Sequence, residues 1–402
     1  MEDLNSDSPE KMSVVEVRTT SQKGRGLYAT APIKEGTVML EEIPLVSAQF
    51  LWNYTYGYLA CEYCLKPLET AETNVRRLTN DYGISLPYAE CCPIQEQLGG
   101  HSKCPDCREV YCSDDCLQTA VKLYHGALCL GAEKGNLQHP VNVLVEFWKK
   151  MHYPPETSSI QLVIKIIGMF KQSNNITGLR AKFDDFVSQT MNEDLMIFHK
   201  MLGENFSQQI DELYELIRRA FDPSTDDRLQ WLTMSGFRSL LALIGTNGQG
   251  IGTSSFADWV RNVSELDLPD NQRESVDVLI DNLYNKLDEV VGTFLNNEGS
   301  ALYSYQSKVN HSCAPNAECR FPRSNNVLAL TATKDIKVGE EICISYLDEC
   351  ALERSRHSRQ KMLSENYLFQ CQCEKCETQV NDPDETSDDE EDDDDVMDSD
   401  SD

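Results

Sequence analysis

The sequence predicts an α+β protein, in which a β-rich domain at the two ends of the chain is split by a cysteine-rich module and a helical segment. Three observations lead to this prediction. Strand patterns bounded by glycines lie in residues 13–57 and 246–350, paired cysteines gather in residues 58–130, and apolar residues recur at steps of three and four in residues 131–245.

The composition is that of a soluble protein large enough for two or three domains. Of the 402 residues, 40% are hydrophobic and 25% are charged, which is ordinary for a globular chain. The first residues are polar and acidic, unlike a secretory signal, and the most apolar run, residues 160–170, is too short to span a bilayer. Sixteen cysteines without a secretory signal favour metal binding over disulfides. We therefore expect a protein of the nucleus or cytoplasm with no membrane contact.

The negative charge is concentrated near the C-terminal end. The formal net charge is −30, and residues 382–402 hold fourteen acidic side chains and no basic one, which leaves −16 for the rest of the chain. We predict a disordered acidic tail over residues 381–402, acting either as a solubilising extension or as a docking arm. An acidic field disfavours direct binding to nucleic acid and suits a basic protein substrate.

The N-terminal residues predict two strand segments with a glycine-rich turn between them. Residues 13–18 alternate weakly, and residues 36–41 form the second segment. The turn reads Lys23-Gly24-Arg25-Gly26. Taken alone, Gly-x-Gly is most simply a hairpin turn, because glycine adopts a positive φ without steric cost.

Eight potential metal ligands recur as closely spaced pairs. They are Cys61 and Cys64, Cys104 and Cys107, Cys112 and Cys116, and His125 and Cys129. Four such pairs fit two closed, structural Zn²⁺ sites, and a set of buried free thiols is the alternative.

An unusually long spacer leaves the ligand assignment open to rivals. Thirty-nine residues separate Cys64 from Cys104, and they include Cys91, Cys92 and His101. The tight Cys104-Pro-Asp-Cys107 hairpin is nevertheless the better chelator.

Helical periodicity follows the cysteine-rich module. Apolar residues recur at steps of three and four over residues 206–221, and this stripe is most simply a core-facing helix surface. Further helices are predicted at residues 140–151, 155–171, 179–191, 269–292 and 354–361. Between them, four glycines follow an apolar segment over residues 245–252, around Asn247, which indicates a loop hinge or a close approach to a ligand.

Two stretches near the C-terminal end place polar side chains where core residues are expected. Residues 310–316 read Asn-His-Ser-Cys-Ala-Pro-Asn, and a glycine turn leads into a strand with Ile342, Ile344 and Tyr346 on one face. Buried polar groups are costly unless they are paired, so these stretches indicate a functional site.

A third metal site is predicted just beyond these stretches. Cys371, Cys373 and Cys376 offer three thiolates, one short of a tetrahedron. Cys313 is the natural fourth ligand, and a redox-active cysteine cluster is the alternative.

Together, these motifs resemble the SET and MYND domain-containing family of protein-lysine methyltransferases, over residues 13 to about 378. The acidic tail and the long spacer point to a divergent branch of that family. The resemblance implies a knot-like SET domain with an N-terminal part at 13–57 and a core at 246–350. It further implies a MYND-type zinc module at 58–130, a helical insert at 131–245 and a post-SET zinc site at 351–380.

The resemblance also implies the roles of individual residues. Tyr346 stands at the position of the active-site tyrosine, and Tyr303 is expected as the second aromatic residue of the lysine channel. The residues expected to contact S-adenosylmethionine are Lys23, Gly24, Arg25, Gly26, Asn247, Asn310, His311, Tyr346 and Phe369. Gly248 and Gln249 stand where an aromatic residue is common in the family, which bears on channel width and on the number of methyl groups added.

In this family the cysteine pairs of the zinc module interleave, which implies three zinc ions in all. One ion is assigned to Cys61, Cys64, Cys112 and Cys116. The second is assigned to Cys104, Cys107, His125 and Cys129, and the third to Cys313, Cys371, Cys373 and Cys376.

Two functions follow as competing hypotheses. The first is a monomeric methyltransferase that acts on lysines of basic proteins such as histones or ribosomal proteins. The second is a catalytically silent adaptor, whose MYND-type module binds peptide motifs in corepressors or other regulators. Retention of Tyr346, Asn310 and His311 favours the enzyme.

Overall fold

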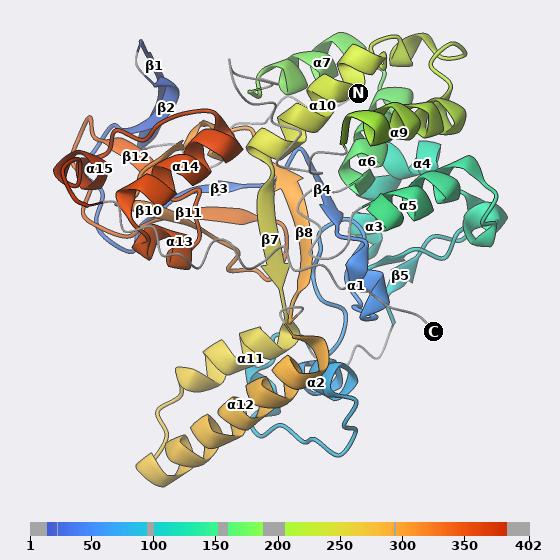
Figure 1. Cartoon of the computed structure of the whole chain (residues 1–402). Coiled ribbons are helices and arrows are strands. Elements are labelled where there is room, and N and C mark those ends of the chain that lie inside the picture. Colours follow the sequence, from blue (N-terminus) through green and yellow to red (C-terminus); the bar gives the residue numbers. More distant parts are fainter. Residues whose placement is uncertain are drawn as a thin grey trace, which may run out of the picture.

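The computed structural model describes residues 14–21, 23–94, 100–151, 160–187, 206–292 and 295–383. It divides into a strand-rich part, a helical body and a helical arm that extends away from both (Figure 1). The predicted tail from residue 384 onward lies outside the described residues. Within the described part, no helix is long and apolar enough to cross a membrane.

The strand-rich part brings the two ends of the chain into one core. Its central sheet has the order β1-β2-β12-β9, in which β12 pairs antiparallel with β2 and parallel with β9. The strands of this sheet are β1 (Val15–Thr20), β2 (Gly24–Ala29), β9 (Asn310–His311) and β12 (Glu341–Ile344). The predicted strand at residues 342–346 therefore ends at Ile344 and leaves Tyr346 just beyond it.

Two further sheets of three strands complete this part. The first has the order β10-β11-β3, with β10 (Ala317–Arg320), β11 (Leu328–Ala332) and β3 (Val38–Glu42). The second has the order β4-β8-β7, with β4 (Val46–Gln49), β8 (Asn297–Leu302) and β7 (Gln249–Thr253). A short hairpin of β5 (Ser102–Lys103) and β6 (Val110–Tyr111) belongs to the cysteine-rich module.

The helical body contains the amphipathic helices predicted from the sequence. The predicted helices at 140–151 and 206–221 match α5 (Pro140–Met151) and α9 (Phe206–Phe221). The other helices of the body are α1 (Trp52–Thr55), α3 (Asp114–Ala120), α4 (Gly126–Leu128), α6 (Ile160–Gln172), α7 (Ile176–Asp184) and α10 (Met234–Asn247). The predicted helix at 179–191 corresponds to α7, and residues 188–191 lie outside the described part.

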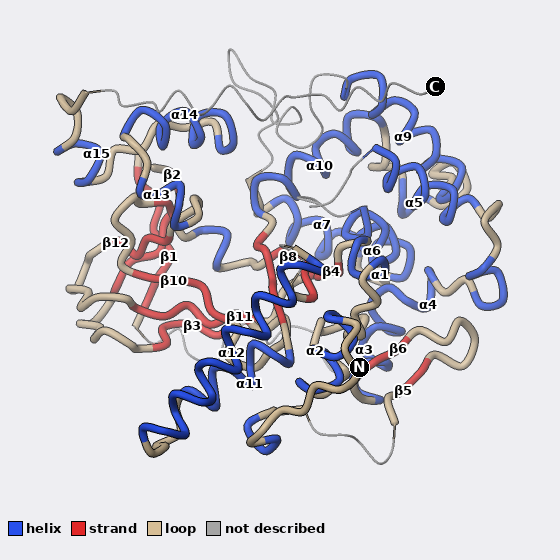
Figure 2. Tube along the Cα trace, turned by 60° about the horizontal axis from the view of Figure 1, so that its bottom comes forward, coloured by secondary structure: helices blue, strands red, loops and turns tan. Residues whose placement is uncertain are grey.

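The arm unites two segments that are far apart in the sequence. The long spacer of the cysteine-rich module supplies α2 (Ala71–Thr79), and the later chain supplies α11 (Ser255–Ser264) and α12 (Asp270–Val291). Figures 1 and 2 show α11 and α12 side by side, and the three helices share a hydrophobic core that includes Trp259 and Cys91. The indole of Trp259 also donates to the carbonyl of Pro87 at 3.0 Å. The spacer therefore forms part of the arm, together with α11 and α12.

The first cysteine hairpin, residues 61–65, is inserted into the strand-rich part. The backbone N–H of Asn326 donates to the carbonyl of Cys64 at 2.8 Å, and the Thr253 hydroxyl donates to the carbonyl of Leu65 at 2.9 Å. The Leu65 side chain is fully buried in the core of the strands. This hairpin is thus part of the strand core.

Three helices close the C-terminal side of the strand-rich part. They are α13 (Glu349–Glu353), α14 (Arg356–Tyr367) and α15 (Glu374–Thr378). The predicted basic helix at 354–361 matches the first half of α14, which ends at Tyr367 with Leu368 in the left-handed conformation. This reversal returns the chain toward the ends of β9 and β12.

Candidate functional site

The two polar stretches predicted from the sequence lie side by side. Asn310 is the pairing partner of Cys343, and His311 is the pairing partner of Ile344. The parallel pairing continues beyond the strands, since the N–H of Ser312 donates to the carbonyl of Ile344 at 2.9 Å. Tyr346 therefore emerges directly beside His311.

Tyr346 is the centre of an aromatic cluster. Its hydroxyl donates to the carbonyl of Val309 at 2.7 Å, and its ring lies 4.8 Å from that of Tyr367 and 6.3 Å from that of Phe369, measured between centroids. Burial raises the pKa of the Tyr346 hydroxyl, so this group stays protonated at neutral pH. The site thus offers a neutral hydroxyl and a backbone carbonyl within an aromatic enclosure.

His311 links this cluster to the third cysteine set. Its Nδ1 accepts the backbone N–H of Tyr346 at 2.9 Å, and its Nε2 lies 3.3 Å from Sγ of Cys313. Burial, with a contribution from Arg359, lowers the pKa of His311 to about 4, so the ring is neutral near pH 7. Because Nδ1 accepts, the proton resides on Nε2, which donates toward Cys313.

The predicted cofactor loop meets Asn310. The Asn310 amide donates to the carbonyl of Arg25 at 3.0 Å and to Oε1 of Glu341 at 2.8 Å, while Lys23 pairs with Oε2 of Glu341 at 2.7 Å. A Cβ at Gly26 would lie 2.9 Å from Glu341 and 3.0 Å from the Asn310 amide, which explains the second glycine of the turn. Glu341 is a site residue that was not predicted from the sequence, although it is the first residue of the strand that follows the predicted glycine turn.

Arg25 and Asn247 both contact the chain that follows α7. The guanidinium of Arg25 pairs with the Asp185 carboxylate, and the Asn247 amide donates to the carbonyl of Val187 at 2.7 Å. Lys308 pairs with the same Asp185 carboxylate at 2.7 Å. The structure therefore brings Arg25 and Lys308, a lysine that was not predicted, against the end of α7, where Asn247 of α10 also makes a contact.

Tyr303 occupies a different environment from Tyr346. Its side chain is 0% exposed within the strand core, and its hydroxyl donates to the carbonyl of Asn326 at 2.5 Å. The second aromatic residue that the structure places on the Tyr346 ring is Tyr367, whose hydroxyl donates to the Tyr346 carbonyl at 3.3 Å. The role of Tyr303 in a lysine channel stays a prediction, and Tyr367 was missed although it lies two residues from Phe369.

The structure gathers the twelve predicted metal ligands into three clusters of four. Within each cluster, the ligand atoms lie within 4.8 Å of one another. All sixteen cysteines are free, and close S···S distances include 3.7 Å between Cys64 and Cys112 and 3.6 Å between Cys313 and Cys376. A tetrahedron with Zn–S bonds of about 2.3 Å has edges of about 3.8 Å, so the clusters fit zinc.

The rival ligands of the spacer lie away from these clusters. Cys92 accepts the N–H of Ala71 and Cys91 packs in the core of the arm, while the ring of His101 contacts the carbonyl of Leu68 at 2.9 Å. The interleaved assignment is therefore the arrangement that the geometry favours.

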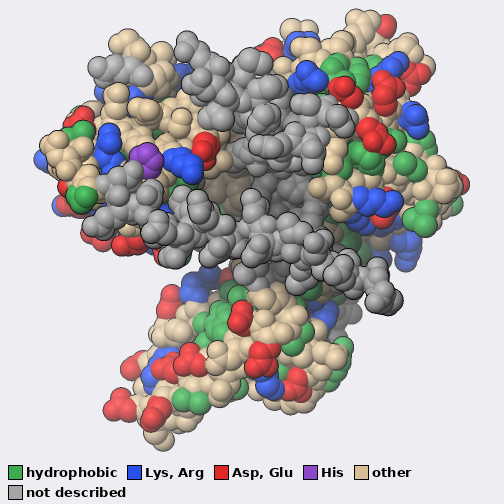
Figure 3. All heavy atoms as spheres, in the orientation of Figure 1, with side chains coloured by type: hydrophobic (Ala, Val, Ile, Leu, Met, Phe, Trp, Pro, Cys, Tyr) green, Lys and Arg blue, Asp and Glu red, His purple; other side chains and the backbone are tan. Residues whose placement is uncertain are grey.

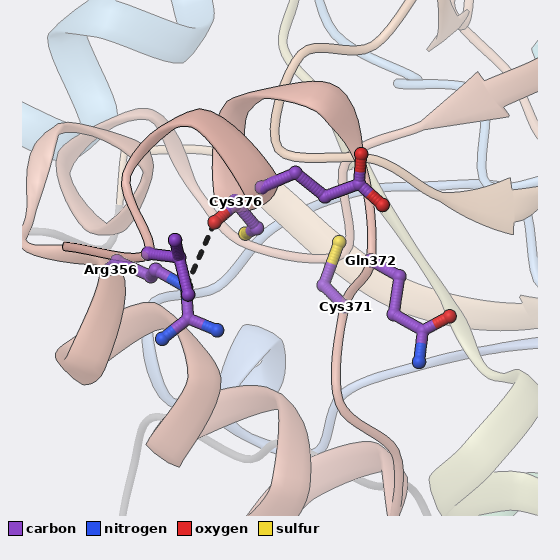
Figure 4. Close-up of a pocket in the computed structure, with 6 residues that line it drawn as sticks. Arg356, Cys371, Gln372 and Cys376 are labelled. Carbon is purple, nitrogen blue, oxygen red and sulfur yellow. Dashed lines mark hydrogen bonds between the residues drawn. The ribbon is translucent and has the colours of Figure 1, made fainter.

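The third cluster is supported by α14. Arg359 is buried with a guanidinium nitrogen 3.9 Å from Sγ of Cys376, and Nε of Arg356 donates to the carbonyl of Cys376 at 2.9 Å. Figure 4 shows Arg356 reaching this carbonyl in a pocket that Cys371 and Cys376 also line. The cluster thereby fixes the chain on both sides of Phe369 and Tyr367.

The residues of the cofactor loop fit S-adenosylmethionine. Lys23, Arg25 and Lys308 are cations that could pair with its carboxylate. A Cβ at Gly24 would meet no atom within 4 Å, so the backbone of the loop is open to close approach at this position. Phe369 lies 6.1 Å from the His311 ring, where the two can cover an apolar ring. When bound, this cofactor supplies the methyl group of a sulfonium.

Comparisons with known proteins agree with this geometry. The SET domain family model matches residues 24–347. The chain is 51% identical over 371 residues to the protein-lysine N-trimethyltransferase SMYD5 of Gallus gallus, which covers 92% of this chain and 87% of that protein. It is 50% identical to SMYD5 of Danio rerio (95% and 91% covered) and 48% identical to SMYD5 of Homo sapiens (93% and 89% covered).

Among solved structures, the crystal structure of the SET domain of LSMT bound to lysine and AdoHcy matches with a TM-score of 0.31 and 12% identity, over 92% of this chain and 54% of that chain. The family model and the three relatives each extend across most of the described structure. The chain therefore belongs to the SET and MYND family of protein-lysine methyltransferases and groups with its fifth member, the SMYD5 proteins.

Proposed function

We propose that this methyltransferase modifies lysines of basic proteins, of the histone or ribosomal class, and carries the lysine to the trimethylated state. The names of the relatives at 48–51% identity describe protein-lysine N-trimethyltransferases, which supports the final state. The net charge of −30 supports a basic substrate, because it steers positively charged partners toward the protein.

The observation that carries the proposal is the enclosure around Tyr346. A lysine amine attacks a sulfonium methyl only as the neutral amine, and an apolar enclosure lowers the amine pKa by desolvation. The rings of Tyr346, Tyr367 and Phe369 supply such surroundings, and the Tyr346 hydroxyl beside the Val309 carbonyl supplies polar groups that orient an amine. Alignment of the reacting atoms is the main contribution asked of these residues.

The proposed compartment is the nucleus or the cytoplasm, where such substrates are found. It is supported by the sixteen cysteines, none of which forms a disulfide. Eleven of them join His125 in the three clusters, and thiols that are available to bind zinc are typical of a reducing compartment.

The test is a methylation assay on purified basic proteins. Zinc-loaded protein is incubated with S-adenosylmethionine and with recombinant histones or ribosomal proteins, and mass spectrometry counts the methyl groups on each lysine. We expect trimethyl-lysine with the wild type and little product with Tyr346→Phe. Equal products from both proteins would contradict the proposed role of the enclosure.

Cofactor binding separates the enzyme from the adaptor hypothesis. Labelled S-adenosylmethionine should bind the wild type and bind Asn310→Ala much more weakly, because the Asn310 amide holds the cofactor loop to Glu341. If the zinc-loaded wild type binds no cofactor, the enzyme hypothesis fails and the adaptor hypothesis is favoured.

A further inference from the structure

The short segment after α7 contacts residues assigned to the cofactor. Asp185 pairs with Arg25 through its carboxylate and accepts from Arg25 through its backbone carbonyl at 2.6 Å. Two residues later, the carbonyl of Val187 accepts the Asn247 amide at 2.7 Å. Two of the predicted cofactor contacts thus have partners within this segment of the same chain.

The Asp185 carboxylate lies between two cations. In addition to Arg25, it pairs with Nζ of Lys308 at 2.7 Å. The Lys308 side chain is only 10% exposed, whereas that of Asp185 is 49% exposed. A cation buried to this degree needs an anionic partner, because removing it from water is costly otherwise. Burial raises the pKa of the Asp185 carboxyl, but Lys308 and Arg25 outweigh this effect and lower it overall, so the carboxylate is ionised at neutral pH.

The cofactor carries a carboxylate of its own on the amino acid end. Arg25 and Lys23 lie on the loop assigned to this carboxylate, and Lys23 is already paired with Glu341. Two carboxylates cannot share Arg25 and Lys308 without mutual repulsion in a partly buried site. One of them must leave when the other arrives.

We infer that Asp185 competes with the cofactor carboxylate for Arg25 and Lys308, and so weakens cofactor binding; the inference rests on the proposed function, since it requires S-adenosylmethionine at this loop. Binding then exchanges one carboxylate for another. The buried Lys308 keeps an anionic partner in both states, and the free energy gained from the new ion pair is offset by the loss of the old one.

The exchange also affects Asn247. Because Val187 lies two residues from Asp185, displacement of Asp185 weakens the hydrogen bond from the Asn247 amide to the carbonyl of Val187. Asp185 therefore controls two contacts at once, and cofactor binding is coupled to the position of the end of α7.

The test compares Asp185→Asn with Asp184→Asn. Asp184 ends the same helix, is 66% exposed and pairs only weakly with Arg180 at 3.6 Å, so it is a matched control for charge removal. Two probes are titrated by calorimetry: S-adenosylhomocysteine, which carries the carboxylate, and 5′-methylthioadenosine, which lacks the amino acid end. Asp185→Asn should bind S-adenosylhomocysteine about threefold to tenfold more tightly than wild type, as expected for loss of a competing, partly exposed ion pair.

The second probe distinguishes competition from a general change of shape. Asp185→Asn should bind 5′-methylthioadenosine as the wild type does, and Asp184→Asn should bind both probes as the wild type does. A weaker or unchanged affinity of Asp185→Asn for S-adenosylhomocysteine would overturn the inference, and so would an equal gain for both probes. Asp185→Ala repeats the test, with thermal unfolding to verify that both variants are folded. If the wild type binds neither probe, the proposed function itself fails, which is a separate result.

Discussion

At the scale of single residues, the two predicted tyrosines illustrate how environment separates function from packing. Burial raises the pKa of both hydroxyls, so both are neutral at pH 7. Tyr346 places its ring among His311, Tyr367 and Phe369, whereas Tyr303 lies wholly within the strand core. A raised pKa alone would not have distinguished them, and their neighbours do.

Removal of the Tyr346 hydroxyl should therefore lower turnover, whereas removal of the Tyr303 hydroxyl should lower stability. Tyr346→Phe should lower turnover by about 10²-fold or more, because it removes an oriented hydroxyl at the reacting centre. It should leave affinity for S-adenosylhomocysteine nearly unchanged, since the backbone N–H that contacts His311 is retained. Tyr303→Phe should cost about 1–2 kcal/mol of stability, because the buried carbonyl of Asn326 loses its partner, with little loss of turnover. Thermal unfolding and steady-state rates of both variants test these expectations. A large loss of turnover in folded Tyr303→Phe would show that Tyr303 acts in the lysine channel after all.

The site residues that were predicted from the sequence belong to local motifs, whereas those that were missed depend on contacts between distant parts of the chain. Asn310, His311 and Cys313 form one short motif, so their chemistry is visible locally. Glu341 and Tyr367 become site residues only because β12 pairs with β2 and β9 and because the third cluster returns α14 to Tyr346. Such roles depend on tertiary pairing, which no local pattern reports.

At the scale of elements, a buried ion pair joins the first cysteine hairpin to α6 and β4. Lys165 on α6 is 3% exposed, and its Nζ contacts Oε1 of Glu62 at 2.8 Å, the Glu62 carbonyl at 2.8 Å and the Ser47 carbonyl at 3.0 Å. Glu62 stands between Cys61 and Cys64, so this lysine holds the zinc hairpin against two other elements. Lys165 lies within the apolar run of residues 160–170 and thus connects three elements.

Replacing only one partner of this pair should be more harmful than replacing both. Lys165→Met should cost about 3–5 kcal/mol, because it leaves the Glu62 carboxylate, whose side chain is only 16% exposed, without a cation. Adding Glu62→Gln to Lys165→Met should recover part of that loss, so the two effects should not add. Denaturant unfolding of the zinc-loaded wild type, both single variants and the double variant measures the coupling. Simple additivity would mean that the pair does not connect these elements.

The third cluster makes a corresponding prediction for the cofactor site. Cys373→Ser should reduce bound zinc from three ions to two and weaken S-adenosylhomocysteine binding by more than about tenfold, because the ligands fix Tyr367 and Phe369 beside His311. Cys350→Ser is the matched control, since Cys350 is exposed on α13 and outside the three clusters. Zinc analysis by mass spectrometry and calorimetry provide the two readouts. Loss of one zinc ion with unchanged affinity for S-adenosylhomocysteine would show that this cluster does not support the cofactor site.

At the scale of the whole molecule, the sequence predicted the parts better than their connections. The paired zinc ligands and the helix at 140–151 were predicted from local spacing and periodicity, and the interleaving of the first four pairs was implied by the family resemblance. The arm was not predicted, because its core joins the spacer of residues 65–103 to α11 and α12, almost two hundred residues later. The apolar residues of the two segments come into contact only in the folded structure, so the sequence of one segment does not indicate that it packs against the other.

Charge is also distributed over the whole molecule, and the tail is its densest part. Fourteen acidic residues lie in residues 382–402, and acidic side chains are also visible over the arm in Figure 3. Deleting residues 381–402 should leave turnover on a short lysine peptide unchanged, because no residue of the Tyr346 enclosure is removed. At low ionic strength, the truncated protein should bind an intact basic protein about tenfold more weakly, and the difference should shrink near 1 M salt, where charges are screened beyond about 3 Å. Calorimetric or fluorescence titrations at both salt concentrations measure this difference. Equal affinity of the full and truncated chains at low salt would show that the tail is only a solubilising extension.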